Sequence, residues 1–302
     1  MIRRLAAIVC VAIGSSVVLA LASAAGRLFT SDSQVIAFSS GYDLWLTDLS
    51  RGITRALTRD GGRALDDAPA WSPDGSRLAF TTVRSNPYNP NLPNGEIAVM
   101  DIDGDNLRLL TRSRAWDDDP AWSPDGRTIA FRSNQDVESG TGVFLIDLDD
   151  PALASRKLIE DPRRSDLMPT WSPDGERIVM HYQVDGTVRI VSVDHIDGGV
   201  SVSLARTGYD PRLSPDGRLL AVWMPAPEGY VMSVGPVGQA LEAMTRIFIN
   251  PAPYTWSADS TMIAIAASER GQAMILLLDV DRRESRIALF APDRVSGIAW
   301  RP

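Results

Sequence analysis

The sequence predicts an all-β protein, a six-bladed β-propeller whose blades are four-stranded antiparallel sheets. Three observations carry this prediction. A short motif recurs along the 302-residue chain, further strand-like segments follow each copy, and one copy is divided between the two ends of the chain. Repeats at intervals of roughly 40 to 50 residues are typical of propellers.

Each copy of the motif is expected to form a β-hairpin. The proline of Ser-Pro-Asp-Gly sets φ at the second turn position, the aspartate accepts hydrogen bonds from nearby backbone, and the glycine takes a left-handed conformation. Apolar residues flank the turn on both sides, as in a pair of strands. The copies are WSPDGSRLAF at 71–80, WSPDGRTIAF at 122–131, WSPDGERIVM at 171–180, LSPDGRLLAV at 213–222 and WSADSTMIAI at 256–265.

The residues that lead the motif and form its turn are assigned structural roles. We expect the leading side chain to pack between blades, and the aspartate and glycine to shape the turn. The turn at 257–260 lacks both proline and glycine, so it is expected to be the least regular. The structural residues are Trp71, Asp74, Gly75, Trp122, Asp125, Gly126, Trp171, Asp174, Gly175, Leu213, Asp216, Gly217, Trp256 and Trp300.

Two further strands complete each blade. A more polar fourth strand is expected after the third, for example at 107–111 and 286–290. Residues 101–106 resemble a calcium loop, but the glycine is misplaced and Arg112 stands where a glutamate is needed, so we interpret them as a hairpin turn. The third strands are expected at 44–49, 96–102, 143–148, 188–193, 230–234 and 274–280.

The divided copy predicts that the ring is closed. A sixth copy begins at Trp300 and stops at Pro302, and residues 32–38 supply its missing half, so that the two pieces together read WRPDSQVIAF. In a closed ring the C-terminal strand pairs with N-terminal strands, which leaves no sheet edge exposed at the junction.

The W-S-P-D-G core with its following I-A-F resembles the WD-like β-propeller repeats of the TolB family, over about residues 32–302. The resemblance implies the propeller fold and an exported protein. Members of that family carry a separate domain before the propeller, which binds envelope partners. Only about 31 residues precede the first blade here, so we expect that domain to be missing.

Residues 1–26 have the character of an export signal or a membrane anchor. Arg3 and Arg4 precede an uncharged stretch at 5–26, which contains a potential cleavage site of the A-x-A type. The stretch is also long enough to span a bilayer with its N-terminus inside. Both alternatives place the propeller outside the cytoplasm, in the periplasm or at the cell surface. We expect residues 27–31 to be a linker and 32–302 to be the propeller, with membrane contact only through 5–26 if that segment is retained.

Composition excludes several classes of function. The net charge of −8, from 30 basic and 38 acidic residues, argues against general nucleic-acid binding, which depends on phosphate neutralisation. One cysteine, Cys10, allows neither an intrachain disulfide nor a cysteine-based zinc site. The sequence has no G-x-S-x-G nucleophile motif. We therefore expect a protein that is not an enzyme and needs no cofactor.

Acidic residues just before the inner strands are the strongest local signal for a site. In a propeller these positions lie near one mouth of the central channel. Their carboxylates would suit a hard divalent cation such as calcium, an arginine- or lysine-bearing partner, or simply solvated loop ends. The last two copies carry Ala252 and Ser296 near these positions, so any metal-binding ring is incomplete. The candidate metal ligands are Asp67, Asp118, Asp166 and Asp210.

Two long polar loops, 83–95 and 133–142, are expected on the same face, and long loops on a rigid scaffold commonly carry binding. Tyr88 and Trp116 are candidate anchors for a partner, and His181 is expected to reach the same face. The candidate partner-binding residues are Arg84, Tyr88, Asn91, Trp116, Asp118, Asp119, Asp166, His181 and Asp210.

The sequence thus favours a monomeric, non-catalytic binding or scaffold protein of the cell envelope, which binds an envelope protein or peptide. Two alternatives stay open. One is a cation-dependent enzyme or carbohydrate-binding propeller that uses the channel mouth. The other is an extracytoplasmic sensor anchored by residues 5–26.

Overall fold

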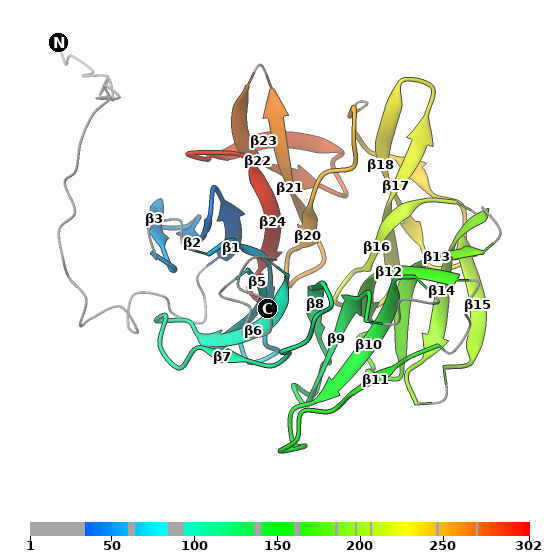
Figure 1. Cartoon of the computed structure of the whole chain (residues 1–302). Helices are drawn as coiled ribbons and strands as arrows, with labels where there is room; N and C mark the ends of the chain where they lie inside the picture. Colours follow the sequence, from blue (N-terminus) through cyan, green and yellow to red (C-terminus); the bar gives the residue numbers. More distant parts are fainter. Residues whose placement is uncertain are drawn as a thin grey trace, which may run out of the picture.

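The computed structural model describes residues 34–59, 64–83, 94–135, 140–159, 164–184, 187–196, 198–205, 207–245, 248–269 and 271–302. Over these residues the chain forms 24 strands, arranged as six four-stranded antiparallel sheets around a ring (Figure 1). The predicted all-β, six-bladed propeller is therefore confirmed. No helix in the described part of the chain is long and apolar enough to cross a membrane.

The blades are numbered from the N-terminus, and each is given from its inner to its outer strand. Blade 1 contains β24 (Val295–Trp300), β1 (Val35–Ser40), β2 (Asp43–Asp48) and β3 (Ile53–Ala56). Blade 2 contains β4 (Asp66–Trp71), β5 (Arg77–Thr82), β6 (Glu96–Asp101) and β7 (Arg108–Leu109). Blade 3 contains β8 (Asp117–Trp122), β9 (Thr128–Ser133), β10 (Gly142–Asp147) and β11 (Ser155–Lys157).

The second half of the ring repeats this order. Blade 4 contains β12 (Arg164–Trp171), β13 (Arg177–Val184), β14 (Thr187–Asp194) and β15 (Val200–Ala205). Blade 5 contains β16 (Tyr209–Leu213), β17 (Leu219–Ala226), β18 (Gly229–Pro236) and β19 (Glu242–Ala243). Blade 6 contains β20 (Tyr254–Trp256), β21 (Met262–Glu269), β22 (Gln272–Asp279) and β23 (Glu284–Phe290).

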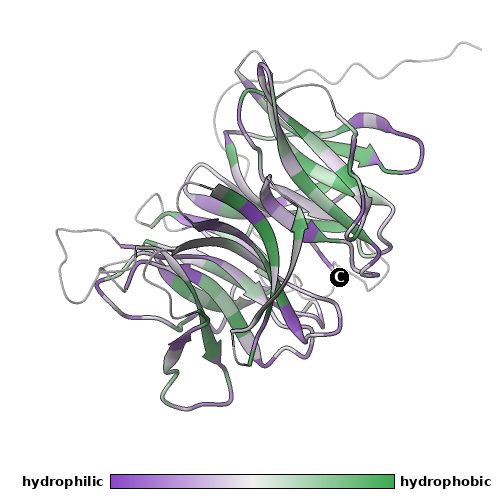
Figure 2. Cartoon of the chain, turned by 90° about the vertical axis from the view of Figure 1, so that its right-hand side faces the viewer, coloured by the Kyte–Doolittle hydropathy of each residue, from purple (hydrophilic) through white to green (hydrophobic). Residues whose placement is uncertain are grey.

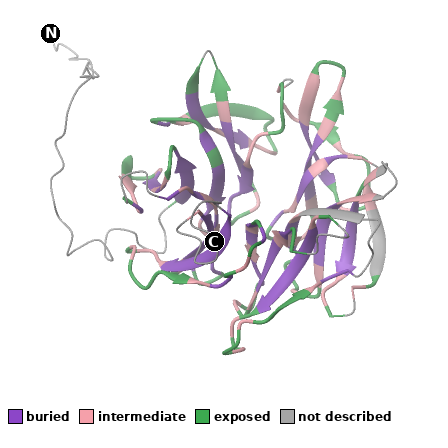
Figure 3. Cartoon of the chain, in the orientation of Figure 1, coloured by how far each residue is buried: buried purple, intermediate pink, exposed green. Residues whose placement is uncertain are grey.

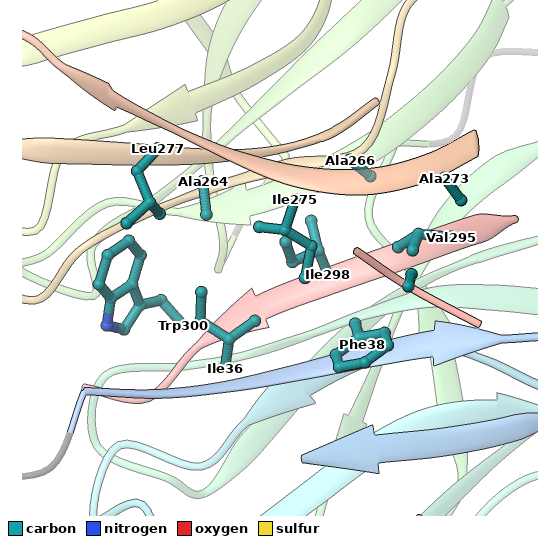
Figure 4. Close-up of a cluster of buried hydrophobic side chains, with 11 residues drawn as sticks. Ile36, Phe38, Ala264, Ala266, Ala273, Ile275, Leu277, Val295, Ile298 and Trp300 are labelled. Atoms are coloured by element: carbon teal, nitrogen blue, oxygen red, sulfur yellow. The ribbon is translucent and has the colours of Figure 1, made fainter. Parts of the chain in front are cut away.

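Blade 1 closes the ring in the way that the divided motif predicts. The C-terminal strand β24 pairs antiparallel with β1, and Ile36 lies opposite Trp300. Apolar side chains from these two strands pack against β21 and β22 of blade 6, where Ile275 and Leu277 face Ile36 and Ile298 (Figure 4). The two ends of the chain thus share one sheet and one hydrophobic cluster.

The repeated turns have the hydrogen bonds that their sequence predicts. Ser72 Oγ donates to Asp74 Oδ1 at 2.6 Å, and the backbone N–H of Gly75 donates to the Ser72 carbonyl at 2.8 Å. Glycines at this position have φ between 64° and 75°, the left-handed region. The hydrogen bond from Ser72 and the one from the Ser76 backbone hold the pKa of Asp74 at about 2.

The fifth turn was expected to be the least regular, and this expectation is wrong. Ser257 Oγ donates to Asp259 Oδ1 at 2.6 Å, as in the other turns, and the Ser260 N–H donates to the Ser257 carbonyl at 3.0 Å. Ser260 itself takes the left-handed conformation, with φ of 63°. The hydrogen-bonded aspartate therefore preserves the turn without proline or glycine.

The leading tryptophans join successive blades. The indole N–H donates to a backbone carbonyl in the preceding blade from Trp71 to Ala299 (3.2 Å), from Trp171 to Ala121 (3.1 Å) and from Trp256 to Arg212 (3.2 Å). Buried residues concentrate in the inner and middle strands, whereas outer strands such as β3 and β23 are mostly exposed (Figure 3). Apolar residues are also concentrated in these inner and middle strands (Figure 2). The interfaces between blades, together with the strands themselves, form the core.

Candidate functional site

The inner strands surround a cavity of about 620 Å³ in the centre of the ring. Its wall repeats a residue–proline pair from blade to blade, and prolines of the hairpin turns line the opposite end. The charged residues among the described lining residues, Asp119, Asp210 and Arg212, belong to the inner strands of blades 3 and 5. The repeated pairs are Ala68-Pro69, Asp119-Pro120, Met168-Pro169, Asp210-Pro211 and Ala252-Pro253.

Four of these pairs share an unusual backbone. The residue before the proline is left-handed, with φ of 48° at Ala68, 51° at Asp119, 55° at Met168 and 50° at Asp210. Each lies where the pairing of the inner strand with its neighbour shifts register. Bulges of this kind re-aim side chains, and left-handed residues other than glycine are strained. The fold thus directs the Asp119 and Asp210 side chains to the channel wall.

In blade 3, Asp118 is already bound on both of its carboxylate oxygens. Arg132 Nε donates to Asp118 Oδ1 at 2.5 Å, and the same guanidinium contacts Oδ2. The indole N–H of Trp116 also donates to Oδ2, at 2.9 Å, while the ring stays partly exposed. Trp116, Asp118 and Arg132 therefore form one fixed group at the channel mouth.

In blade 5, Asp210 pairs with Arg212 across 3.2 Å between Oδ1 and Nε. Burial raises the pKa of Asp210, and Arg212 counteracts that effect. The Arg212 guanidinium lies over the ring of Tyr254 at 5.4 Å, and the Tyr254 hydroxyl is within 2.5 Å of the Asp210 carbonyl oxygen. This second pair is thus held from two blades.

Asp119 lies next to both pairs. Its carboxylate is 3.6 Å from Arg132 Nε, although that guanidinium is engaged by Asp118, and 32% of its side chain is exposed. Burial in the channel, followed by repulsion from Asp118, raises the pKa of Asp119 to about 7. Among the described side chains, these three carboxylates and two guanidiniums leave an excess negative charge centred on Asp119 once the pH rises above about 7.

Asp67 belongs to the closure of the ring more than to the mouth. Its Oδ1 accepts hydrogen bonds from Ser39 Oγ at 2.5 Å and Ser296 Oγ at 2.9 Å, both in blade 1.

Among the described residues, no three histidine, cysteine, aspartate or glutamate side chains converge in a way that could hold a metal ion. The backbone of Asp166 lies in β12, but its side chain is outside the described part of the chain.

Of the other predicted partner-binding residues, three lie outside the described part of the chain and one, His181, is buried. Arg84, Tyr88 and Asn91 lie outside the described residues. His181 was expected directly after an inner strand and on the binding face, and the structure corrects this placement. It lies within β13, is 4% exposed and packs edge-on against Tyr209, with the ring centroids 5.0 Å apart. Burial lowers its pKa.

Sequence reasoning missed Arg132 and Arg212. Arg132 lies on the second strand of its blade, where only the register brings it opposite Asp118. Arg212 follows Pro211 on an inner strand, two residues from its partner. The left-handed backbone of Asp210 and the bulge beside it interrupt the alternation of side chains, so strand spacing alone did not indicate this pair.

Comparison with known proteins agrees with this architecture. Residues 28–234 match the family described as TolB beta propeller domain. The chain belongs to this family. The predicted resemblance to TolB-like propellers is thereby confirmed.

Solved structures with the same fold include TolB-family propellers and enzymes. TolB from Acinetobacter baumannii has a TM-score of 0.74 at 18% identity, over 89% of this chain and 67% of that one. A putative TolB from Agrobacterium tumefaciens has a TM-score of 0.65 at 17% identity, over 89% and 92%. An oligogalacturonate lyase in complex with manganese has a TM-score of 0.57 at 16% identity, over 78% and 71%. At these identities the likeness concerns the fold alone.

Proposed function

We propose that this member of the TolB propeller family is a non-catalytic, extracytoplasmic binding or scaffold protein of the bacterial cell envelope. Its binding surface is the channel mouth, where it receives a protein or peptide partner. The observation that carries this proposal is the fixed group of Asp118, Arg132 and Trp116, with Asp119 beside it.

The chemistry of the mouth suits a protein partner. Ion pairs held on a rigid ring are pre-organised, so little side-chain freedom is lost on binding. Trp116 offers a partly exposed aromatic surface of the kind that anchors interfaces. The excess negative charge at Asp119 favours a partner segment with a lysine or arginine side chain near an apolar residue.

The cation-dependent alternative has less support. Asp118 and Asp210 each bind an arginine, and Asp67 accepts hydroxyl hydrogen bonds, so their oxygens are engaged before any ion arrives. Titration with calcium or manganese during thermal melting tests this alternative, because a bound ion raises the melting temperature by mass action.

Placement outside the cytoplasm rests on residues 1–26 and on membership of the family. Cleavage of this segment would leave a free monomer in the periplasm or at the cell surface. Retention would leave an anchored protein, as the sensor alternative requires. The intact mass of the protein recovered from cells distinguishes the two.

Photocrosslinking in cells tests the binding surface. A photoreactive phenylalanine derivative at position 116 should capture a partner. The same residue at position 281, in the β22–β23 turn at the opposite end of the ring, should not. Equal capture from both positions, or capture from position 281 alone, would refute the proposed surface. Deletion of residues 84–94 then tests whether the adjoining loop takes part.

A further inference from the structure

A second cavity, of about 440 Å³, lies between blades 2 and 3. It shares no lining residue with the channel cavity. Apolar side chains from Leu110, Ile146 and Leu153 form part of its wall, and hydroxyls of Thr111, Ser113 and Ser155 form another part. Its volume is in the range of small-molecule sites, which typically measure about 300 to 1,000 Å³.

A buried carboxyl group lines this groove. Asp117 is 2% exposed and accepts a hydrogen bond from Ser133 Oγ at 2.5 Å. Glu96 is 3% exposed and accepts hydrogen bonds from Thr111 Oγ1 at 2.7 Å and from Asn94 Nδ2 at 2.9 Å. Neutral donors thus surround both carboxyls.

In the described part of the chain, the hydrogen bonds to these two groups come from neutral donors. Burial raises the pKa of Asp117, and burial together with repulsion from Asp117 raises the pKa of Glu96. No arginine, lysine or histidine of the described residues is among the main causes of either shift. A positively charged hydrogen-bond donor that reaches Asp117 would therefore gain a strong, poorly screened interaction.

Two exposed arginines, Arg108 and Arg112, line the same groove. Their planar guanidinium groups match the geometry of a carboxylate. One groove thus offers a buried carboxyl as the acceptor for a cation and exposed arginines as donors for an anion, and apolar side chains line the same groove.

We propose that this groove binds a small zwitterion of the free amino acid class. The ammonium group donates to Asp117, the carboxylate pairs with Arg112 or Arg108, and an apolar side chain packs against Leu110, Ile146 and Leu153. This site is independent of the channel mouth and of the function proposed for it.

A bare divalent cation fits the groove less well than an ammonium group. Calcium takes six to eight oxygen ligands, and of the described residues that line this groove Asp117 alone carries a carboxylate. An ammonium group needs only a few acceptors at hydrogen-bond distance, which the carboxyl and the nearby hydroxyls provide.

Calorimetric titration of the full chain at neutral pH tests the proposal with L-leucine and two relatives. 3-Methylbutylamine is leucine without its carboxylate, and 4-methylpentanoate is leucine without its amine. L-Leucine should bind, and each relative should bind at least about tenfold more weakly because one charged contact is lost. No heat of binding with L-leucine, or equal affinity for either relative, would overturn the proposal.

Two arginine variants provide the matched comparison. Arg112→Ser should weaken L-leucine binding about tenfold. Arg114→Ser removes the same charge from an exposed residue that does not line the groove, and should leave the affinity unchanged. Asp117→Asn should also weaken binding, and its folding is checked by circular dichroism. Equal losses in the two arginine variants would contradict the site.

Discussion

Asp118 and Arg132 lie directly opposite each other on β8 and β9 and form a two-point ion pair at the channel mouth. The hairpin turn between these strands, together with the bulge between Asp118 and Ala121, sets that register. A slip of one residue would move the two side chains to opposite faces of the sheet. The repeated structural motif therefore also positions a pair of the proposed binding surface.

Removal of Arg132 should destabilise the fold. Arg132→Ala leaves the largely buried Asp118 carboxylate with the indole of Trp116 as its remaining donor, and we expect a loss of about 2 kcal/mol in the free energy of unfolding. The control is Arg127→Ala, which breaks a pair with Asp149 whose side chains are 71% and 69% exposed. That loss should stay below about 0.5 kcal/mol. Urea denaturation measures both, and equal losses would contradict the assigned role of Arg132.

The stability of the ring should depend on Asp119 between weakly acidic and neutral pH. Its pKa, raised to about 7, means that the folded chain holds this proton more tightly than the unfolded chain does. The resulting stabilisation is complete below the unfolded pKa of about 4 and is lost as the pH rises through about 7.

Asp119→Asn keeps the size of the side chain and tolerates the left-handed backbone, but it cannot ionise. The variant should therefore gain stability relative to the native protein as the pH is raised from 5 to 8. Urea denaturation across this range checks the trend. A difference that stays constant with pH would show that Asp119 does not titrate there.

His181 should give the opposite dependence. Burial lowers its pKa, so the unfolded chain binds the proton more tightly. The stabilisation that comes from a neutral imidazole at position 181 is present above the unfolded pKa of about 6.5. It is lost as the pH falls through the lower pKa of the folded state. His181→Gln should reduce the loss of melting temperature between pH 7 and pH 5. If the melting temperatures of the variant and the native protein fell by the same amount between pH 7 and pH 5, His181 would not be the group that titrates.

The indole hydrogen bonds between blades should be measurable in a matched pair of variants. Trp71→Phe removes the bond to Ala299, whereas Trp122 Nε1 has no hydrogen-bond partner among the described residues. Both substitutions remove similar volume, so Trp71→Phe should cost about 1 kcal/mol more than Trp122→Phe. Thermal or urea unfolding compares them. A larger loss for Trp122→Phe would mean that packing, not the hydrogen bond, dominates at these positions.

The sequence allowed prediction of the propeller because each blade repeats signals that act locally. The hydrogen bond from Ser72 to Asp74, the glycine at 75 and the divided motif at Trp300 all depend on neighbouring residues or on the repeat itself. The regularity of the turn at Ser260 was missed, because a hydrogen-bonded aspartate was not expected to replace both proline and glycine.

The channel mouth was only partly predictable. The acidic residues were expected just before the inner strands, and the structure places them within the first residues of those strands. Arg132 comes from another strand and needed the register. The left-handed residues before four of the channel-wall prolines depend on strand bulges that no local signal marked. His181 looked accessible, yet its burial depends on Tyr209 from the next blade.

The affinity of the captured partner for two charge variants tests the central claim most directly. Asp119→Asn removes one negative charge at the channel mouth, and Asp281→Asn removes one from the turn at the opposite end of the ring. Binding to the mouth predicts that Asp119→Asn raises the dissociation constant about tenfold at pH 8 while Asp281→Asn leaves it unchanged. An unchanged affinity for Asp119→Asn, or an equal loss in both variants, would contradict a partner-binding site at the channel mouth.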